Sequence, residues 1–418
     1  MRVLWLSTTP GLYDSKDSGY NGIGWISSVQ SLIQQEDGLE LALAFLTSNV
    51  EDSEKIILGT HYYPIYSKAP NVFNKLKNYY GGYRNIDDDA YVPQILKIIS
   101  DFNPDIIQLF GMENQLATIL GKTKIPIVVH LQGLLAPYDN AFFPVDFNKN
   151  SFMWPFSKRE WIIRNGYIYA KKSIHVRGVR ERLLFKKVDY VMGRTDWDFE
   201  VSQLLAPQSR YFHVDEVMRS CFYDHAGEWI SKHRDKIIIT STISQTIYKG
   251  LDLIIKAASL LEHETHLDFE WQVVGVSPNS SYTRFFEKTI KMKSSKVRYM
   301  GVLSAEQLCD TLLDSDIYVH PSYIDNSPNS VCEAQLLGMP VVATGVGGIT
   351  SLIEHEDSGL LVPANAPYEL AYWIKYIAEN TCKAEELGHN GVNVALRRHD
   401  RKEIVKQLLF VYSSILEK

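Results

Sequence analysis

Short apolar runs alternate with helix-like segments along most of the chain, and this alternation restricts the possible folds more than any other feature of the sequence. The runs are continuous stretches of Val, Ile and Leu, as in residues 127–131, which is typical of strands buried on both faces of a parallel sheet. Segments of about 10–15 residues with helical character separate most of them, and this order favours βαβ units. The predicted strands cover residues 3–7, 39–47, 105–110, 127–131 and 188–193 in the first half and 236–242, 270–276, 297–303, 316–321, 341–345 and 359–362 in the second.

Two sets of strands predict two doubly wound, Rossmann-like α/β domains. The rhythm breaks at residues 215–234, where polar and aromatic residues mix, so we expect a linker near 220–235. The predicted domains are therefore 1–225 and 226–400. A last helix, 401–418, has no strand after it, and we expect it to pack back on the N-terminal domain.

Composition excludes several functional classes. The net charge of -6 argues against a nucleic-acid partner, because neutralising phosphates requires clustered Lys and Arg. No apolar segment approaches the roughly 20 residues that span a bilayer. The first apolar run is too short for a signal peptide, and the cysteines are too far apart for a zinc cluster or a dense disulfide framework. We therefore expect a cytoplasmic protein, soluble or at the inner face of the membrane.

Residues 315–348 carry the most informative pattern. A buried strand is followed by a loop containing Asp325 and by a helix predicted over 328–337, with Ser327 as its N-cap and Gly338 just past its end. The loop then lies at the carboxyl end of a parallel strand, where open α/β sheets bind ligands. Free N–H groups at the helix start favour a diphosphate there. Asp325 and Glu333 are two acceptors suited to hydroxyls of a sugar and a ribose, although a cap and a solvated helix face is the structural alternative.

This segment resembles the donor-site signature of retaining GT-B glycosyltransferases of family 4, or glycosyl transferases group 1. The matching residues are His320-Pro321-Ser322, Asp325, Glu333-Ala334, Gly338-Met339-Pro340-Val341-Val342-Ala343 and Gly347-Gly348. The resemblance implies a GT-B fold, in which the two domains face a central cleft. It also implies that Glu333 binds the donor ribose and that Asp325 contacts the transferred sugar. The backbone that should line the sugar and diphosphate comprises Asn326, Ser327, Pro328, Asn329 and Ser330. Asp325 stands where Glu is usual, so the sugar or its tilt can differ.

The start of the second domain adds a cation. Lys249 and Gly250 open a predicted amphipathic helix, and the resemblance makes Lys249 a ligand of the diphosphate. The Arg that the family often carries five or six residues earlier is replaced by Ser244 or Ile243, and polar Thr242, Ser244 or Gln245 is expected to substitute weakly. Two further loops should cradle the nucleotide base, and their expected contacts are Val276, Val302 and Leu303.

In the first half, the glycine-rich loop at residues 19–25 fills the place where relatives approach the donor phosphates, so we expect contacts from Gly22 and Gly24. A dinucleotide-binding loop is a poor fit, because the spacing is not G-x-G-x-x-G. Relatives commonly place a His just before the glycine of residues 127–133. Here Gln132 holds that place and His130 lies two positions back, on the same face of the strand. We expect His130 at the reacting sugar, with a structural role as the alternative, and Gln132 and Arg194 at the acceptor.

Two Asp-x-Asp strings, at 87–89 and 196–198, lack the strand context of a metal-binding motif, and we expect them to be solvated turn acids. Family 4 enzymes resemble metal-independent catalysts, so no metal or other cofactor is expected beyond a nucleotide-diphosphate sugar as co-substrate. Residues 151–187 interleave many Lys and Arg with aromatic residues, which suits a membrane surface, a basic acceptor groove or a solvated helix.

The resemblance therefore predicts a glycosyltransferase that acts with retention on a glycan, lipid-linked or small-molecule acceptor, in bacterial polysaccharide or glycolipid synthesis by analogy. A nucleotide-sugar epimerase on the same scaffold would act on the donor without an acceptor. A non-catalytic sugar-nucleotide-binding subunit would bind the donor without turnover. An NAD-dependent oxidoreductase would need a proper glycine fingerprint, which the sequence lacks.

Overall fold

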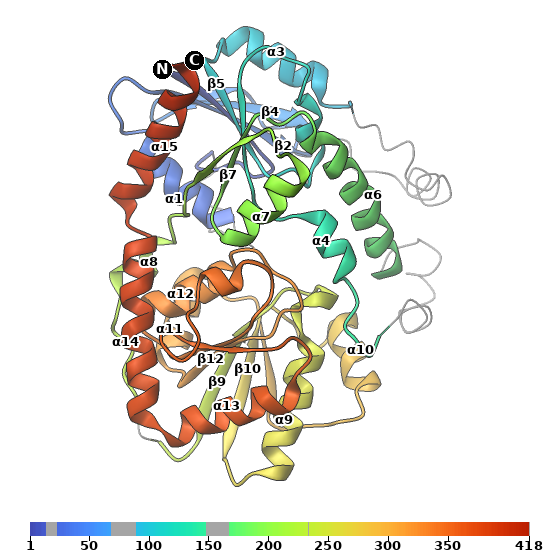
Figure 1. The fold of residues 1–418 in the computed structure, drawn as a ribbon, viewed down its shortest axis with the longest axis vertical. Coiled ribbons are helices and arrows are strands. Elements are labelled where there is room, and N and C mark those ends of the chain that lie inside the picture. The colour runs from blue at the N-terminus through green and yellow to red at the C-terminus, as the bar shows by residue number, and fades with distance from the viewer. Residues whose placement is uncertain (14–22, 68–88, 148–166, 233, 418) are drawn as a thin grey trace.

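The computed structural model describes residues 1–13, 23–67, 89–147, 167–232 and 234–417, which form two α/β lobes stacked end to end (Figure 1). Eight strands make the sheet of the N-terminal lobe, in the order β3-β4-β2-β1-β5-β6-β7-β8. All its pairings are parallel except the β3–β4 hairpin. Its strands are β1 (Arg2–Ser7), β2 (Glu40–Thr47), β3 (Lys55–Ile57), β4 (Thr60–Tyr66), β5 (Ile106–Phe110), β6 (Ile127–His130), β7 (Tyr190–Gly193) and β8 (Arg210–His213).

The C-terminal lobe holds a six-stranded parallel sheet in the order β11-β10-β9-β12-β13-β14. Its strands are β9 (Ile237–Thr242), β10 (Phe269–Val274), β11 (Val297–Gly301), β12 (Ile317–His320), β13 (Val341–Thr344) and β14 (Leu360–Val362). The predicted fold class is thus confirmed: both lobes are doubly wound and Rossmann-like. Every predicted strand is present, shortened or shifted by a residue or two at its ends.

Helices cover both faces of each sheet, as the double-sided burial of the strands requires. In the N-terminal lobe they are α1 (Ile23–Ile33), α3 (Val92–Phe102), α4 (Leu135–Asn140), α6 (Tyr167–Phe185) and α7 (Asp196–Leu205), with a 3-10 turn at Gln115–Ile119. The crossing segment, which joins the two lobes between His213 and Ile237, carries α8 (Ser220–Asp224). The C-terminal lobe has α9 (Leu251–Glu264), α10 (Ser281–Thr289), α11 (Ala305–Leu313), α12 (Asn329–Leu337), α13 (Pro367–Glu379) and α14 (Thr381–Arg398), with 3-10 turns at Ile247–Lys249 and Gly347–Ser351.

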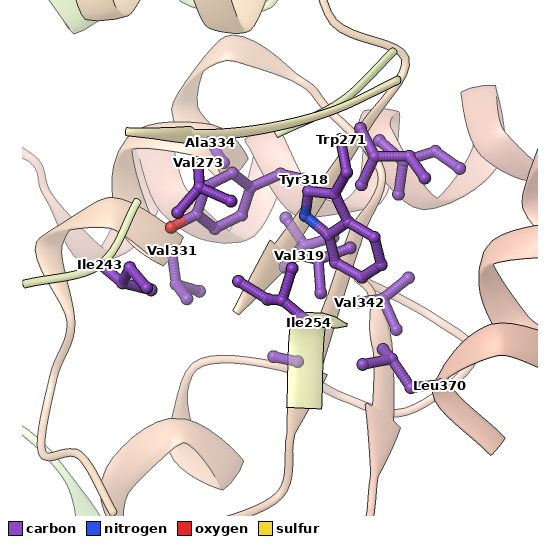
Figure 2. Packing of buried hydrophobic residues seen from close by; sticks show 14 of the residues in the cluster. Ile243, Ile254, Trp271, Val273, Tyr318, Val319, Val331, Ala334, Val342 and Leu370 are labelled. Carbon is purple, nitrogen blue, oxygen red and sulfur yellow. The ribbon is translucent and has the colours of Figure 1, made fainter. Parts of the chain in front are cut away.

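The C-terminal lobe has one continuous hydrophobic core. Figure 2 shows part of it, in which Trp271 of β10 and Tyr318 of β12 lie among aliphatic side chains such as Val331 of α12 and Ile254 of α9. Trp271, Tyr318 and Val331 are fully buried. Burying side chains of this size stabilises by about 1.5–3 kcal/mol each, so α12 and the strand before it are held rigidly.

The last helix, α15 (Arg401–Leu416), leaves the C-terminal lobe and packs on the N-terminal one, where both chain ends lie close together (Figure 1). Its Tyr412 is fully buried, accepts a hydrogen bond from Trp5 Nε1 at 3.1 Å and donates one to Gln108. The chain therefore crosses between the lobes twice, between His213 and Ile237 and again at the start of α15. His399, at the second crossing, makes a 2.8 Å hydrogen bond through Nδ1 to the carbonyl of Glu216 in the first crossing.

Three strands were not predicted. The β3–β4 hairpin at the sheet edge carries Lys, His and Tyr rather than a continuous apolar run, and the four residues of β8 at the opposite edge are largely polar. β3 and β8 are edge strands that bury few side chains, whereas β4 is largely buried but mixes His, Tyr and Pro with its aliphatic residues, so hydrophobic patterning marks all three poorly.

Candidate active site between the two domains

A cavity of about 720 Å³ lies between the lobes and takes its lining from both. In the C-terminal sheet, β9 and β12 are neighbours, although they belong to opposite halves of the winding. In the N-terminal sheet, β1 and β5 have the same relation. Crevices at the carboxyl ends of such strand pairs are where doubly wound sheets bind ligands. Residues following all four strands line this one cavity: Thr8 and Thr9 after β1, Glu113 and Asn114 after β5, Lys249 after β9, and Asp325 after β12.

Asp325 and Lys249 form an ion pair on the C-terminal side of the cavity, with 2.5 Å between Nζ and Oδ2. The same carboxylate accepts hydrogen bonds from His320 Nε2 at 2.9 Å and from Ser322 Oγ at 3.2 Å. Burial alone would raise the pKa of Asp325, but the charge of Lys249 and the bond from His320 hold this pKa far below its ordinary value. Burial lowers the pKa of His320, so its imidazole is neutral. Asp325 is therefore a fixed anion that can accept hydrogen bonds from hydroxyl groups but cannot serve as an acid.

The chain places Lys249 there through a close backbone approach. Lys249 ends a short 3-10 turn, and Gly250 after it has a left-handed φ of 79°. A β-carbon at Gly250 would lie 2.0 Å from the carbonyl oxygen of Pro321, at the end of β12. Only glycine fits, which explains why the Lys-Gly pair brings the ammonium beside the Asp325 loop.

Glu333 lies on α12, and its side chain is 3% exposed at the cavity wall. Arg219 Nε donates to Glu333 Oε1 at 2.8 Å. Burial raises the pKa of Glu333 to about 6, against the opposing charge of Arg219. Arg219 lines the same cavity from the segment between the domains and was missed in the sequence, because it lies in a stretch without helical or strand periodicity.

The start of α12 also faces the cavity, which Ser327, Pro328, Asn329 and Ser330 line. The predicted cap was wrong by one position: the helix begins at Asn329, and Pro328 precedes it without a side-chain cap. Ser327 instead donates its hydroxyl to Glu216 Oε1 at 2.7 Å, in the crossing segment. The backbone N–H of Val331 bonds to the carbonyl of Pro328, so the N–H groups of Asn329 and Ser330 are those available to a ligand.

Asn326 does not line the cavity and joins the lobes instead. Its amide nitrogen donates to Asp198 Oδ1 at 2.8 Å, and its amide oxygen accepts from the Thr195 hydroxyl at 3.2 Å. Asp198 is fully buried and also accepts from the backbone N–H of Arg194 at 2.9 Å. The expectation that residues 196–198 are solvated turn acids was therefore wrong for Asp198. Of the string at 87–89, only Asp89 lies within the described residues, where it pairs with Lys122 at the surface.

The residues expected at the base were Val276, Val302 and Leu303, and only Leu303 lines the cavity. Val276 is fully buried and forms an isolated bridge with Gly301, whereas Val302 is 58% exposed outside the cavity. Thr242 and Ser244, named as substitutes for the absent arginine, do line the cavity; Gln245 does not.

On the N-terminal side, Gly24, Gln132 and Arg194 line the cavity, while Gly22 lies outside the described residues. Gln132 accepts a hydrogen bond from Trp25 Nε1 at 3.2 Å. Arg194 is held by Glu216 at 3.3 Å and by the carbonyl of Gln132 at 2.9 Å.

His130 does not reach the cavity. Its ring is 1% exposed, packs against Trp25 and Phe110, and makes a 3.1 Å hydrogen bond through Nδ1 to Gln108. Burial and the charge of Arg194 lower its pKa to about 3. The expected contact of His130 with the reacting sugar is thus replaced by packing behind the cavity wall.

Two further lining residues, Glu113 and Arg177, were missed in the sequence. Glu113 follows β5 at the ligand-binding end of the sheet, and this position could have singled it out. Arg177 comes from α6, within the basic stretch 151–187, of which 151–166 lie outside the described residues. On α6, Arg177 and Arg180 point inward and donate to the backbone carbonyl of Glu113 at 3.3 and 3.1 Å. Part of the basic stretch therefore forms the cavity wall.

Within the described part of the chain, no helix combines the length and apolar character needed to cross a bilayer. The same residues contain no group of three or more His, Cys, Asp or Glu side chains arranged to hold a metal ion.

Known proteins with a similar sequence or fold are glycosyltransferases and related synthases. Residues 234–380 match the family described as "Glycosyl transferases group 1". The D-rhamnosyltransferase WbpZ of Pseudomonas aeruginosa is 22% identical over 57% of this chain, and the match spans 66% of that protein's length, just under two thirds. Sucrose-phosphate synthase from Thermosynechococcus elongatus has a TM-score of 0.72 at 13% identity, and each chain is covered completely. HepE of Anabaena, solved in complex with UDP-glucose, has a TM-score of 0.63 at 16% identity over 99% of this chain and 100% of its own. The chain thus has the GT-B fold, and its C-terminal domain matches the group 1 glycosyl transferases in sequence.

Proposed function

We propose that this protein is a retaining glycosyltransferase that moves a sugar from a nucleotide-diphosphate donor to a hydroxyl group of a glycan, lipid-linked or small-molecule acceptor. One observation carries the proposal: Asp325, Lys249, Glu333 and the first turn of α12 line a single cavity between two GT-B domains. The similarity of residues 234–380 to group 1 glycosyl transferases and the UDP-glucose bound by HepE support it.

Each part of the donor meets a group of matching chemistry. Lys249 and the free N–H groups of α12 stabilise the diphosphate, because a compact cation and a helix N-terminus both attract phosphate oxygens. Glu333 accepts hydrogen bonds from the ribose hydroxyls. Asp325 accepts them from hydroxyls of the transferred sugar, a role that suits a carboxylate held ionised. These groups supply the charge that the donor needs, so we propose no metal or other cofactor.

In the proposed reaction the bond between the anomeric carbon and the diphosphate oxygen breaks, and a bond from the acceptor oxygen forms on the same face of the sugar. The acceptor proton moves to the departing diphosphate. Lys249 and the helix N–H groups stabilise the negative charge that develops on this leaving group, which is the largest electrostatic demand of the step. Holding both substrates in one cavity supplies the remaining acceleration through positioning, worth about 7–11 kcal/mol in favourable cases.

Thermal unfolding in the presence of sugar nucleotides tests the proposal. A ligand that binds only the folded protein raises the melting temperature as its concentration exceeds the dissociation constant. We expect at least one of UDP-glucose, UDP-N-acetylglucosamine, GDP-mannose, GDP-rhamnose and ADP-glucose to stabilise the wild-type protein. We expect Lys249→Met to abolish the shift and the surface variant Lys375→Met to retain it. Equal shifts in both variants would overturn the assignment.

A further inference from the structure

Glu113 is a carboxylate in the cavity that none of the donor contacts uses. It follows β5 in the N-terminal domain, whereas Asp325 and Glu333 lie on the C-terminal side. The three acids therefore enter the same space from two domains. The donor contacts proposed above use the C-terminal side of the cavity, so Glu113 faces the space that they leave.

The Glu113 carboxyl sits in a fitted backbone recess. A β-carbon on Gly111, whose φ is 76°, would lie 1.9 Å from Glu113 Oε2, and one on Gly133 would lie 3.2 Å from Oε1. The backbone N–H groups of Glu113 and Gly133 favour its charged form, and so do the charges of Arg177 and Arg194. Glycines at both positions thus let the carboxyl rest against the backbone at the ends of β5 and β6.

The surroundings of Glu113 combine polar and apolar groups in the way that a sugar requires. Asn114 and Thr9 line the same side of the cavity with hydrogen-bonding groups, and Trp25 and Phe110 line it with aromatic rings. Sugars present hydroxyl groups at their edges and C–H groups on their faces, so carboxylates and aromatic rings are complementary partners.

We propose that Glu113 binds hydroxyl groups of the acceptor and that the acceptor subsite beside it is therefore built for a sugar, a glycan or glycoside. This inference rests on the proposed glycosyl transfer. The carboxylate accepts hydrogen bonds from one or two acceptor hydroxyls and turns one of them toward the sugar that Asp325 holds. The donor contacts of Lys249 and Glu333 do not involve it.

The ionisation state of Glu113 matters for this role. Burial raises its pKa to about 7, although the N–H groups and the two arginines oppose the shift. The charged or titratable groups that face it are Arg177, Arg180 and Glu181 of α6, Arg194 after β7, Tyr138 of α4, and Tyr248. The ionised carboxylate accepts hydrogen bonds from hydroxyl groups, and its fraction falls as the pH drops below this pKa. We therefore expect acceptor binding to weaken by about ten-fold from pH 8 to pH 6.

Saturation-transfer NMR with a panel of methyl glycosides, on protein loaded with UDP, tests the subsite. We expect at least one glycoside to bind the wild-type protein, and Glu113→Gln to weaken that binding at least ten-fold and remove its pH dependence. The UDP affinity of this variant should stay within two-fold of wild type. Glu51→Gln, at an exposed position of the same domain, should change neither binding event.

Glu113→Asp keeps the charge while shortening the side chain, and it serves if the amide variant does not fold. We expect it to weaken glycoside binding while preserving the pH dependence. Unchanged glycoside binding in the folded Glu113 variants, or no glycoside binding to UDP-loaded wild-type protein, overturns the subsite. Failure of the proposed function would be distinct, because the wild-type protein would then not bind a sugar nucleotide or nucleoside diphosphate.

Discussion

Asn326 Nδ2 lies 2.8 Å from Asp198 Oδ1, and this hydrogen bond ties the Asp325 loop of one domain to the first turn of α7 in the other. Thr195 bonds the other end of the same amide. The position of the Asp325 loop is therefore set by both domains, and the cavity exists in this form only while the domains are joined there.

Breaking this contact should loosen the domains more than it perturbs either core. Asn326→Ala leaves the buried Asp198 carboxylate without its amide donor, and an unsatisfied buried group costs about 1–3 kcal/mol. Urea unfolding should show this loss. Asn390→Ala removes an exposed hydrogen bond to Asp357 and should change stability by less than about 0.5 kcal/mol. Equal effects of the two variants would mean that the interdomain bond has no special weight.

Asp325 should stabilise the folded protein at neutral pH. Its folded pKa is held below the unfolded value of about 3.9, so the stabilisation is present above that value and is lost as the pH falls toward the folded pKa. Asp325→Asn removes the ionised partner of Lys249. Melting temperatures between pH 3 and pH 8 should show a wild-type advantage that shrinks below about pH 4. An advantage independent of pH would contradict the assigned ion pair.

Glu333 titrates in the opposite sense. Its folded pKa of about 6 is above the ordinary value of about 4.3. The ligand-free protein therefore loses stability relative to the unfolded chain as the pH rises between these two values. In the proposed donor site the ribose hydroxyls bind the ionised form of Glu333, so we expect tighter binding of the stabilising sugar nucleotide as the pH rises from 5 to 7. Calorimetric titration should show this trend for wild type and lose it for Glu333→Gln. A trend retained in the variant would place the titrating group elsewhere.

Arg219 should act on both the fold and the donor. It is the hydrogen-bonding partner of Glu333, and Arg219→Gln leaves that buried carboxylate without a charged neighbour. We therefore expect the pKa of Glu333 to rise and sugar-nucleotide binding at pH 6 to weaken by about ten-fold, with partial recovery at pH 8. Arg401→Gln, which removes a cation near Tyr223 outside the cavity, is the control. If binding were weakened equally at pH 6 and pH 8, Arg219 would contact the donor directly rather than act through Glu333.

The sequence predicted the doubly wound domains and the position of the Asp325 loop at the end of a strand, because both depend on local signals. Continuous apolar runs mark the central strands, Asp325 lies within the dense pattern of residues 315–348, and Gly250 belongs to the short Lys-Gly pair. The sequence placed His130 at the reacting sugar, with a structural role as the alternative, and could not decide between them, because burial behind Trp25 depends on how α1 packs over the sheet. Glu333, the partner of Arg219, and Asn326, the interdomain partner of Asp198, come from segments more than 100 residues away, and no local pattern encodes such contacts.

The central claim is that one cavity holds the diphosphate between Lys249 and the start of α12, with Glu333 on the ribose. A crystal structure with UDP, or with the nucleoside diphosphate of the sugar nucleotide that stabilises the protein most, tests this directly. We predict that the diphosphate lies within hydrogen-bond distance of Lys249 Nζ and the backbone N–H groups at Asn329 and Ser330, and that the ribose hydroxyls contact Glu333. A nucleotide bound elsewhere, with these three groups left free of it, would contradict the account.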